Sequence, residues 1–173
     1  MSYNEYKNTE SNRRGSKAEI NFRRLFESKG YKIREATPRE NKLHGFDFHI
    51  NNSTVNVKSR SKKNRKDSKA QDDIMWVEFK NVEGGQGWLY SEKCVWIAKE
   101  LENSWLIFTR ADLLKFAERK CDKFKLLNYC PSDPYLRYKR AGNQDVIAMI
   151  KIRDLKDSCK SYNVLKTPRS SDI

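Results

Sequence analysis

The chain has 173 residues, and its 36 lysines and arginines exceed its 23 aspartates and glutamates to give a formal net charge of +13. This length is typical of one domain. The charge favours a polyanionic partner, with nucleic acid first and an anionic membrane surface second. No apolar stretch is long enough to cross a bilayer, and the first residues lack an apolar signal region, so we expect a soluble, cytoplasmic protein without membrane contact.

Composition divides the chain into three parts. Residues 1–14 are polar and charged and are predicted to be a flexible arm, residues 15–160 a single domain, and residues 161–173 a tail. The four cysteines contain no CxxC pair, which argues against a zinc site and against a disulfide framework.

A first helix is predicted to open at Ser16, which is a good N-cap, and Glu19 three residues later completes a capping box. Apolar residues recur at helical spacing until Gly30, where the helix is expected to end. Glu19 shares a helical face with Phe22, which points it inward. A short strand at 31–34 and a charged loop follow.

Residues 46–50 and 54–58 are predicted to form two strands joined by a turn at 51–53. Side chains alternate between the two faces of a strand, so the first strand presents one apolar face and one polar face. The apolar face is expected to consist of Phe46, Phe48 and Ile50.

The polar face of this hairpin carries the first functional signal. Asp47 and His49 share it on the first strand, and Asn56 and Lys58 share a face on the second. Folding the two strands into an antiparallel hairpin brings Asp47 close to Lys58. An acid and a lysine that project together from a sheet can hold a divalent cation and a phosphate.

The run at 58–69 is basic, polar and without periodicity, and is predicted to be a loop or a disordered flap. Residues 73–80 are predicted to be a third strand of the same sheet, beside the 54–58 strand. Their period-2 pattern places Glu78 on one face with Trp76, opposite the apolar side chains.

The later elements are expected in a simple order. A turn at 84–87 is followed by buried strands at 88–90, 95–98 and 104–108, a helix from the N-cap Thr109 to about Arg119, an irregular segment at 121–145 and a last strand at 146–152. Helix, strands, helix and strand indicate a mixed α/β domain around one sheet.

The order of Glu19 on a helix, Asp47 on a strand and Asn56-Val57-Lys58 on the next strand resembles the PD-(D/E)XK nuclease superfamily, which includes restriction endonucleases, phage exonucleases and archaeal Holliday-junction resolvases. Two later blocks, Trp-Val-Glu-Phe-Lys-Asn-Val at 76–82 and Gly-Trp-Leu-Tyr at 87–90, also look like a virus- and phage-associated branch of it. The resemblance implies a restriction-endonuclease-like mixed sheet flanked by helices, in one nuclease-like domain. A viral origin would place the protein in the host cytoplasm.

The resemblance also implies an activity: hydrolysis of phosphodiester bonds in DNA with Mg²⁺ or Mn²⁺. By this resemblance Asp47 is the central metal ligand, and Glu19 reaches the metal from its helix, directly or through water. The backbone carbonyl of Val57 supplies a further ligand. Lys58 orients the attacking water or stabilises the developing charge.

One position departs from the superfamily pattern, because Asn56 stands where the acid of (D/E)XK is expected. Its carbonyl oxygen can still ligate a metal, without a charge. Glu78 on the following strand can supply the missing carboxylate, as can Asp72 or Asp73. The alternative is a site that binds nucleic acid without cutting it.

The basic run after the second strand is interpreted as a phosphate clamp, with a solvated loop as the alternative. The residues expected to contact nucleic acid are Arg60, Lys62, Lys63, Arg65 and Lys66.

Each candidate residue also has a structural interpretation. Glu19 can serve only the capping box, Lys58 can simply begin the basic run, and Glu78 can pair with Lys80 on an exposed strand. The expected function is a metal-dependent nuclease acting on double-stranded DNA. The alternatives are an inactive nucleic-acid-binding protein on the same fold and a basic packaging protein. Because many superfamily members dimerise, a homodimer is a further expectation.

Overall fold

A computed structural model of the protein describes residues 10–64, 67–159 and 162–167. Within these ranges the strands form two mixed sheets, with the orders β1-β2-β3-β5-β6-β10 and β4-β9-β8-β7. The strands of the first sheet are β1 (Ile33–Glu35), β2 (Phe48–Ile50), β3 (Ser53–Lys58), β5 (Trp96–Glu100), β6 (Ser104–Thr109) and β10 (Asn163–Lys166). Those of the second are β4 (Ile74–Lys80), β7 (Asp122–Leu127), β8 (Leu136–Lys139) and β9 (Val146–Lys151). β3 pairs with β5 in parallel, as β7 does with β8, and the other neighbours are antiparallel.

The described helices pack against both sheets. They are α2 (Glu10–Ser28), α3 (Pro38–His44), α4 (Arg110–Lys120), α5 (Ile152–Ser158) and the short 3₁₀ helix η1 (Trp88–Tyr90). None of them is both long and apolar enough to span a bilayer.

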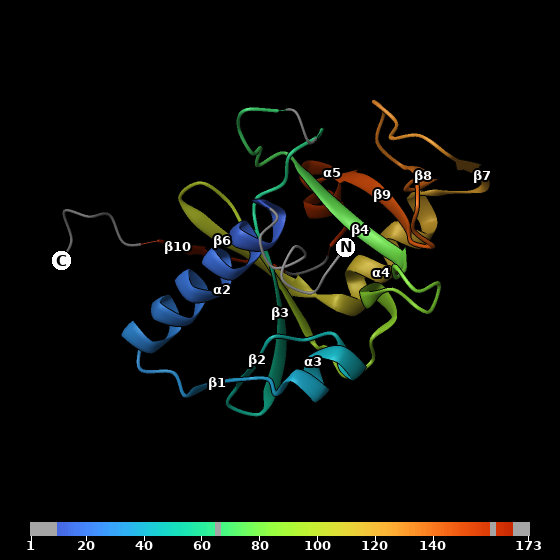
Figure 1. Cartoon of the computed structure of the whole chain (residues 1–173). Helices are drawn as coiled ribbons and strands as arrows, with labels where there is room; N and C mark the ends of the chain where they lie inside the picture. Colours follow the sequence, from blue (N-terminus) through green and yellow to red (C-terminus); the bar gives the residue numbers. More distant parts are fainter. Residues whose placement is uncertain (1–9, 65–66, 160–161, 168–173) are drawn as a thin grey trace.

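The first sheet is the middle layer of the molecule. On one face, α2 packs Phe22 and its apolar neighbours against Val55 and Val57 of β3. The other face is covered by the second sheet and α4, through a cluster that includes Val77 and Phe116. Figure 1 shows α2 on one side of β3 and the second sheet, with α4 and α5, on the other.

The first helix begins earlier than predicted. α2 starts at Glu10, so Ser16 is not an N-cap and Glu19 lies inside the helix, where it has no capping role. The polar turns before Ala18 gave no amphipathic signal, which is why the sequence placed the start too late. The expected arm is therefore wrong for residues 10–14, while residues 1–9 lie outside the described ranges.

The predicted hairpin is confirmed, and its register pairs Phe48 with Val55 and Ile50 with Ser53. One detail is wrong: Phe46 does not share a face with Phe48 and Ile50. It precedes β2 and packs in the cluster on the other side of the sheet, while Phe48 and Ile50 face α2.

The strand over 73–80 is present as β4, but it lies in the second sheet, and β3 is flanked by β2 and β5. Its alternation is as predicted, with Met75, Val77 and Phe79 buried. Alternation tells which face is apolar and not which strand lies alongside, so the pairing partner was beyond reach of the local pattern.

Several segments expected to be irregular contain regular elements. The charged loop contains α3, the segment 121–145 contains β7 and β8, and the expected tail contributes β10. Two further boundaries differ from the prediction. Residues 88–90 form η1 rather than a strand, and α5 begins at Ile152, where the last strand was expected to finish. β7 and β10 are edge strands with mostly exposed side chains, so they carry no alternating apolar pattern.

Candidate functional site

Asp47 lies immediately before β2 and is held by two hydrogen bonds. Its Oδ2 accepts from the Val57 backbone N–H at 2.7 Å, and its Oδ1 accepts from Asn41 Nδ2 at 2.8 Å. Burial raises the pKa of Asp47, opposed by the positive charge of Lys58 and by these hydrogen bonds. The sequence missed Asn41, because its position on α3 depends on the capping box of Thr37 and Glu40 that begins that helix.

Glu19 reaches the same region from the middle of α2. Burial and, after it, the negative charge of Asp47 raise the pKa of Glu19 to about 7, against the opposing effect of Lys58. A carboxylate whose charge raises the pKa of another lies near it in a partly desolvated space. The structure thus brings together Glu19, Asp47 and Lys58, as expected from the sequence.

Lys58 ends β3 and is the positive centre of this group. Burial lowers its pKa, and Asp47 and then Glu78 oppose that shift by stabilising the ammonium. Its Nζ lies 4.2 Å from the centroid of the Trp88 ring, in cation–π contact. Trp88 therefore positions the lysine, a role that the sequence pattern did not indicate.

The two later sequence blocks meet beside Lys58. Gly87 passes so close to β4 that a Cβ there would lie 2.2 Å from the Glu78 carbonyl oxygen, so no other residue fits. This approach lets the Trp88 N–H donate to Glu78 Oε1 at 3.4 Å. The close approach of Gly87 to β4 thus brings Trp88 of η1 and Glu78 of β4 together beside Lys58.

Asn56 is buried, with 5% of its surface exposed. Its Nδ2 donates to the Gly45 carbonyl, while its Oδ1 has no hydrogen-bond partner among the described residues. An unpaired buried carbonyl oxygen carries a desolvation cost that a bound cation would remove.

Glu78 was expected on a strand beside β3, but it lies on β4 in the second sheet. The charges that act on it are first Lys58 and then Asp145 and Arg140, and burial raises its pKa. No three acidic, histidine or cysteine side chains of the described part of the chain form a group able to hold a metal ion. Glu78 as a metal ligand stays a prediction, and its direct relation is to Lys58.

The other acids considered at this site have structural partners. Asp72 accepts from Arg60 Nε at 2.7 Å and from the Glu102 backbone N–H at 2.8 Å. Asp73 is exposed at the start of β4 and its carbonyl accepts from the Ile152 N–H. Asp72 is therefore committed to closing the loop before β4.

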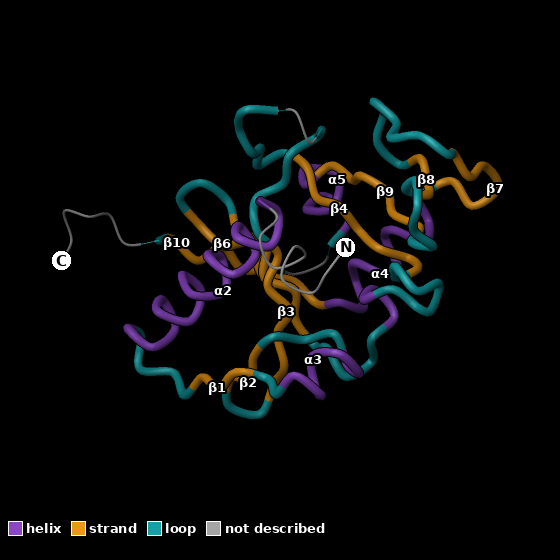
Figure 2. The backbone as a smooth tube through the Cα atoms, in the orientation of Figure 1, coloured by secondary structure: helices purple, strands orange, loops and turns teal. Residues whose placement is uncertain are grey.

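The described part of the basic segment is a tethered loop between β3 and β4 (Figure 2). Gln71 N–H donates to the Ser61 carbonyl at 2.7 Å, and Trp76 Nε1 donates to the Lys62 carbonyl at 2.9 Å. Arg60 pairs with Asp72 and, at 3.7 Å, with Glu102. Its guanidinium closes the loop, whereas Lys63 is half-buried and Arg65 and Lys66 lie outside the described ranges.

The oxygen atoms at this site are of the types that bind a divalent cation. Glu19 and Asp47 supply neighbouring carboxylates, and Asn56 supplies the unpaired oxygen. Hard cations such as Mg²⁺ take oxygen ligands of these types. A site with two carboxylates and neutral oxygens carries less negative charge than one with three acids, so the affinity for the cation would be lower.

Comparisons of the chain with protein-family models, with curated proteins and with solved structures found no match.

Proposed function

We propose that the protein is a divalent-metal-dependent nuclease that hydrolyses phosphodiester bonds in DNA. The observation that carries the proposal is the convergence of Glu19, Asp47 and Lys58 from a helix and two strands. A packaging protein has no need of two neighbouring carboxylates in a chain of net charge +13. The basic composition supplies the attraction to a polyanion.

Each residue has a defined task in this proposal. Glu19, Asp47 and the Asn56 oxygen would hold Mg²⁺ or Mn²⁺, with the Val57 carbonyl as a further ligand. The bound ion would lower the pKa of a coordinated water and offset the charge of the phosphate. Lys58, kept in place by Trp88, offers an ammonium to the phosphate oxygens where negative charge develops.

The test uses purified protein with plasmid, linear DNA and RNA, in Mg²⁺, Mn²⁺ or EDTA. We expect cleavage of DNA that needs the metal and is lost in Asp47→Ala and Asp47→Asn. The second variant keeps the size of the side chain and the Oδ1 acceptor for Asn41 but loses the Oδ2 acceptor for the Val57 N–H, so its melting temperature is measured beside its cleavage to separate lost chemistry from lost folding. Asp157→Asn, an exposed position on α5, is the matched control. Equal cleavage by wild type and Asp47→Asn would refute the proposal.

Asn56 favours a second candidate, a protein on this fold that binds nucleic acid without cutting it. The substitution Asn56→Asp separates the two. In EDTA the new carboxylate would face the Gly45 carbonyl that Asn56 now binds, so we expect a lower melting temperature. If the side-chain oxygen at position 56 is a metal ligand, Mn²⁺ should restore the melting temperature of the variant, and cleavage should be preserved or increased. An inactive wild type whose Asn56→Asp variant gains no stability from Mn²⁺ would favour the binding protein.

A further inference from the structure

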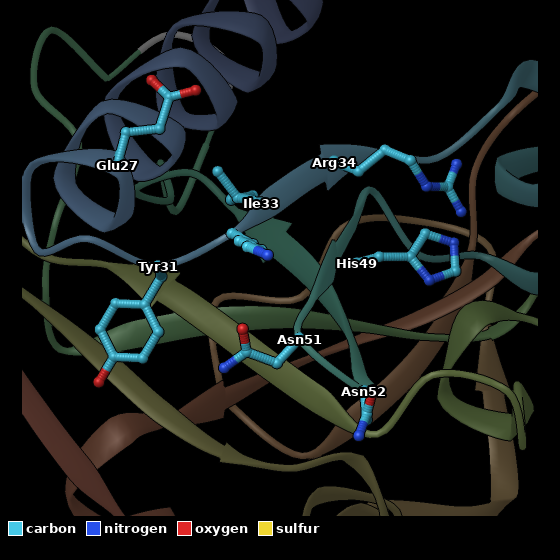
Figure 3. A pocket seen from close by; sticks show the side chains of 8 residues that line it. Glu27, Tyr31, Ile33, Arg34, His49, Asn51 and Asn52 are labelled. Carbon is cyan, nitrogen blue, oxygen red and sulfur yellow. The ribbon is translucent and has the colours of Figure 1, made fainter.

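A groove of about 760 Å³ lies along the outer edge of the first sheet, beside β1 and the turn between β2 and β3. Figure 3 shows Glu27 and Tyr31 at one end, Arg34 and His49 at the other, and Asn51 between them. The volume is within the range of about 300–1,000 Å³ that ligand-binding clefts occupy.

The lining combines an aromatic ring, positive charge and amide groups. Tyr31 leaves 46% of its surface exposed and rests against Phe26, with ring centroids 5.2 Å apart. Lys32 has no ion-pair partner in the part of the chain that the structure describes, and Asn51 and Asn52 offer amide donors and acceptors. These groups match the parts of a nucleotide, which are an aromatic base with polar edges and a phosphate.

Ion pairs with acids fix most of the charged side chains around the groove. Glu27 is paired with Arg23 at 2.8 Å. Glu40 accepts hydrogen bonds from Arg34 at 3.3 Å and lies 3.0 Å from His49, which fixes both side chains at the end of the groove. Arg34 Nη1 also donates to the Glu35 carbonyl at 3.0 Å, so the Arg34 Nε–H remains as a donor to a phosphate oxygen, and Lys32 supplies a positive charge without an ion-pair partner among the described residues.

The groove is rigid at its floor. Asn51 adopts a left-handed backbone conformation, with a φ of 51°, and its N–H donates to the Lys32 carbonyl at 3.2 Å. The turn is thereby tied to the segment that carries Tyr31. Preorganised groups lose less conformational entropy when a ligand binds.

The groove adjoins the candidate active site through two elements. On α3, Glu40 holds the groove residues Arg34 and His49, and the next residue, Asn41, holds Asp47. On β1, Arg34 lines the groove, and the next residue, Glu35, raises the pKa of Glu19. The groove and the candidate active site are therefore supported by the same two elements, α3 and β1.

We propose that this groove binds a nucleotide of a single-stranded segment of the substrate, with its base stacked on Tyr31 and its phosphate held by Lys32 and Arg34. The choice of nucleic acid rests on the proposed function. The faces of a base inside a duplex are covered by its neighbours and cannot stack on a tyrosine ring, so the groove selects DNA ends, gaps or branches with unpaired nucleotides.

The first experiment measures binding in EDTA, where no cleavage occurs, by fluorescence anisotropy with a short single strand and a blunt duplex of the same sequence. Tyr31→Ala should weaken binding of the single strand about tenfold, as expected for one lost stacking partner, and leave duplex binding within about twofold. Tyr129→Ala, which is 61% exposed and outside the groove, is the matched control. Thymidine monophosphate as competitor distinguishes a free nucleotide from a strand.

The outcomes separate this inference from the proposed function. Equal single-strand binding by the two tyrosine variants would overturn the groove as a binding site, even if metal-dependent cleavage is observed. Equal losses for the single strand and the duplex would overturn its selectivity. If thymidine monophosphate competes with an affinity equal to that of the single strand, the ligand of the groove is a free nucleotide instead. A protein that cleaves nothing but loses single-strand binding in Tyr31→Ala would retain the groove and refute the nuclease.

Discussion

Glu19 is the residue whose environment departs most clearly from the sequence expectation. A capping residue would be exposed, whereas Glu19 lies inside α2 with a pKa raised to about 7 by burial and by Asp47. Its raised pKa has a consequence for stability. The folded protein binds a proton at Glu19 more tightly than the unfolded chain does, so this contribution to stability is present at low pH and is lost as the pH rises toward 7 and above.

We therefore predict that Glu19→Gln gains stability relative to the wild type as the pH rises. The glutamine keeps the size of the side chain and cannot ionise, so it escapes the cost of a buried charge beside Asp47. In EDTA, urea denaturation should give a difference in the free energy of unfolding that grows in favour of Glu19→Gln between about pH 5 and about pH 8. Glu83→Gln, at an exposed position, is the control. A difference that is independent of pH would mean that Glu19 is not desolvated.

At the residue scale, the sequence predicted that Glu19, Asp47 and Lys58 lie near one another but not which residues hold them there. Asp47, Lys58 and Glu19 followed from strand alternation and from a resemblance whose motif spans three elements. Asn41 and Trp88 did not, because their contacts depend on how α3 and η1 fold back onto the sheet. Such long-range contacts leave no periodic signal in the chain.

At the scale of elements, the loop between β3 and β4 is held at its base. Lys99, fully buried on β5, donates through Nζ to the Ser59 carbonyl at 2.6 Å and to Ser61 Oγ at 3.0 Å. Burial lowers the pKa of Lys99 to about 7. With the ion pair of Arg60 and Asp72, this lysine fixes where the basic loop leaves the sheet.

The loop lysines and arginines should therefore divide into two classes. Replacing Lys63, Arg65 and Lys66 by serine is expected to weaken DNA binding and to reduce the slope of log affinity against log salt by up to about 0.9 per lost phosphate contact. The melting temperature should barely change. Arg60→Ser should instead lower the melting temperature, because it leaves Asp72 and the Ala70 carbonyl without their partner. An unchanged salt slope in the triple variant would exclude the loop from the binding surface.

The elements that the sequence predicted well are those with a buried face. The hairpin of β2 and β3, the strands β5 and β6 and the helix capped by Thr109 each show regular apolar spacing, and each is present. β7 and β10 lie at sheet edges, where exposed side chains are free to vary, so only the pairing of the whole chain defines them. The division into two sheets was missed for the same reason: strand order is a property of the assembled molecule.

At the scale of the whole molecule, the first sheet is shared by both hydrophobic clusters. Neighbouring residues of β5 face opposite ways, with Ile97 in the cluster around the second sheet and Ala98 in the cluster beneath α2. β6 does the same with Leu106 and Trp105. Because one set of strands supports both clusters, disruption of either cluster weakens the sheet on which the other packs.

The shared sheet predicts a single cooperative unfolding transition. Val55→Ala, beneath α2, and Val77→Ala, in the second sheet, each remove buried methyl groups worth about 2 kcal/mol, and each should lower the melting temperature by roughly 4–8 °C. In both variants, tryptophan fluorescence and circular dichroism should report the same midpoint, as two-state unfolding requires. Val82→Ala, at a position 48% exposed, should change little. Two separate midpoints in either variant would mean that the two sheets unfold independently. Lys58 belongs to the first sheet and Glu78 to the second, so the candidate site would then lie between two folding units rather than within one.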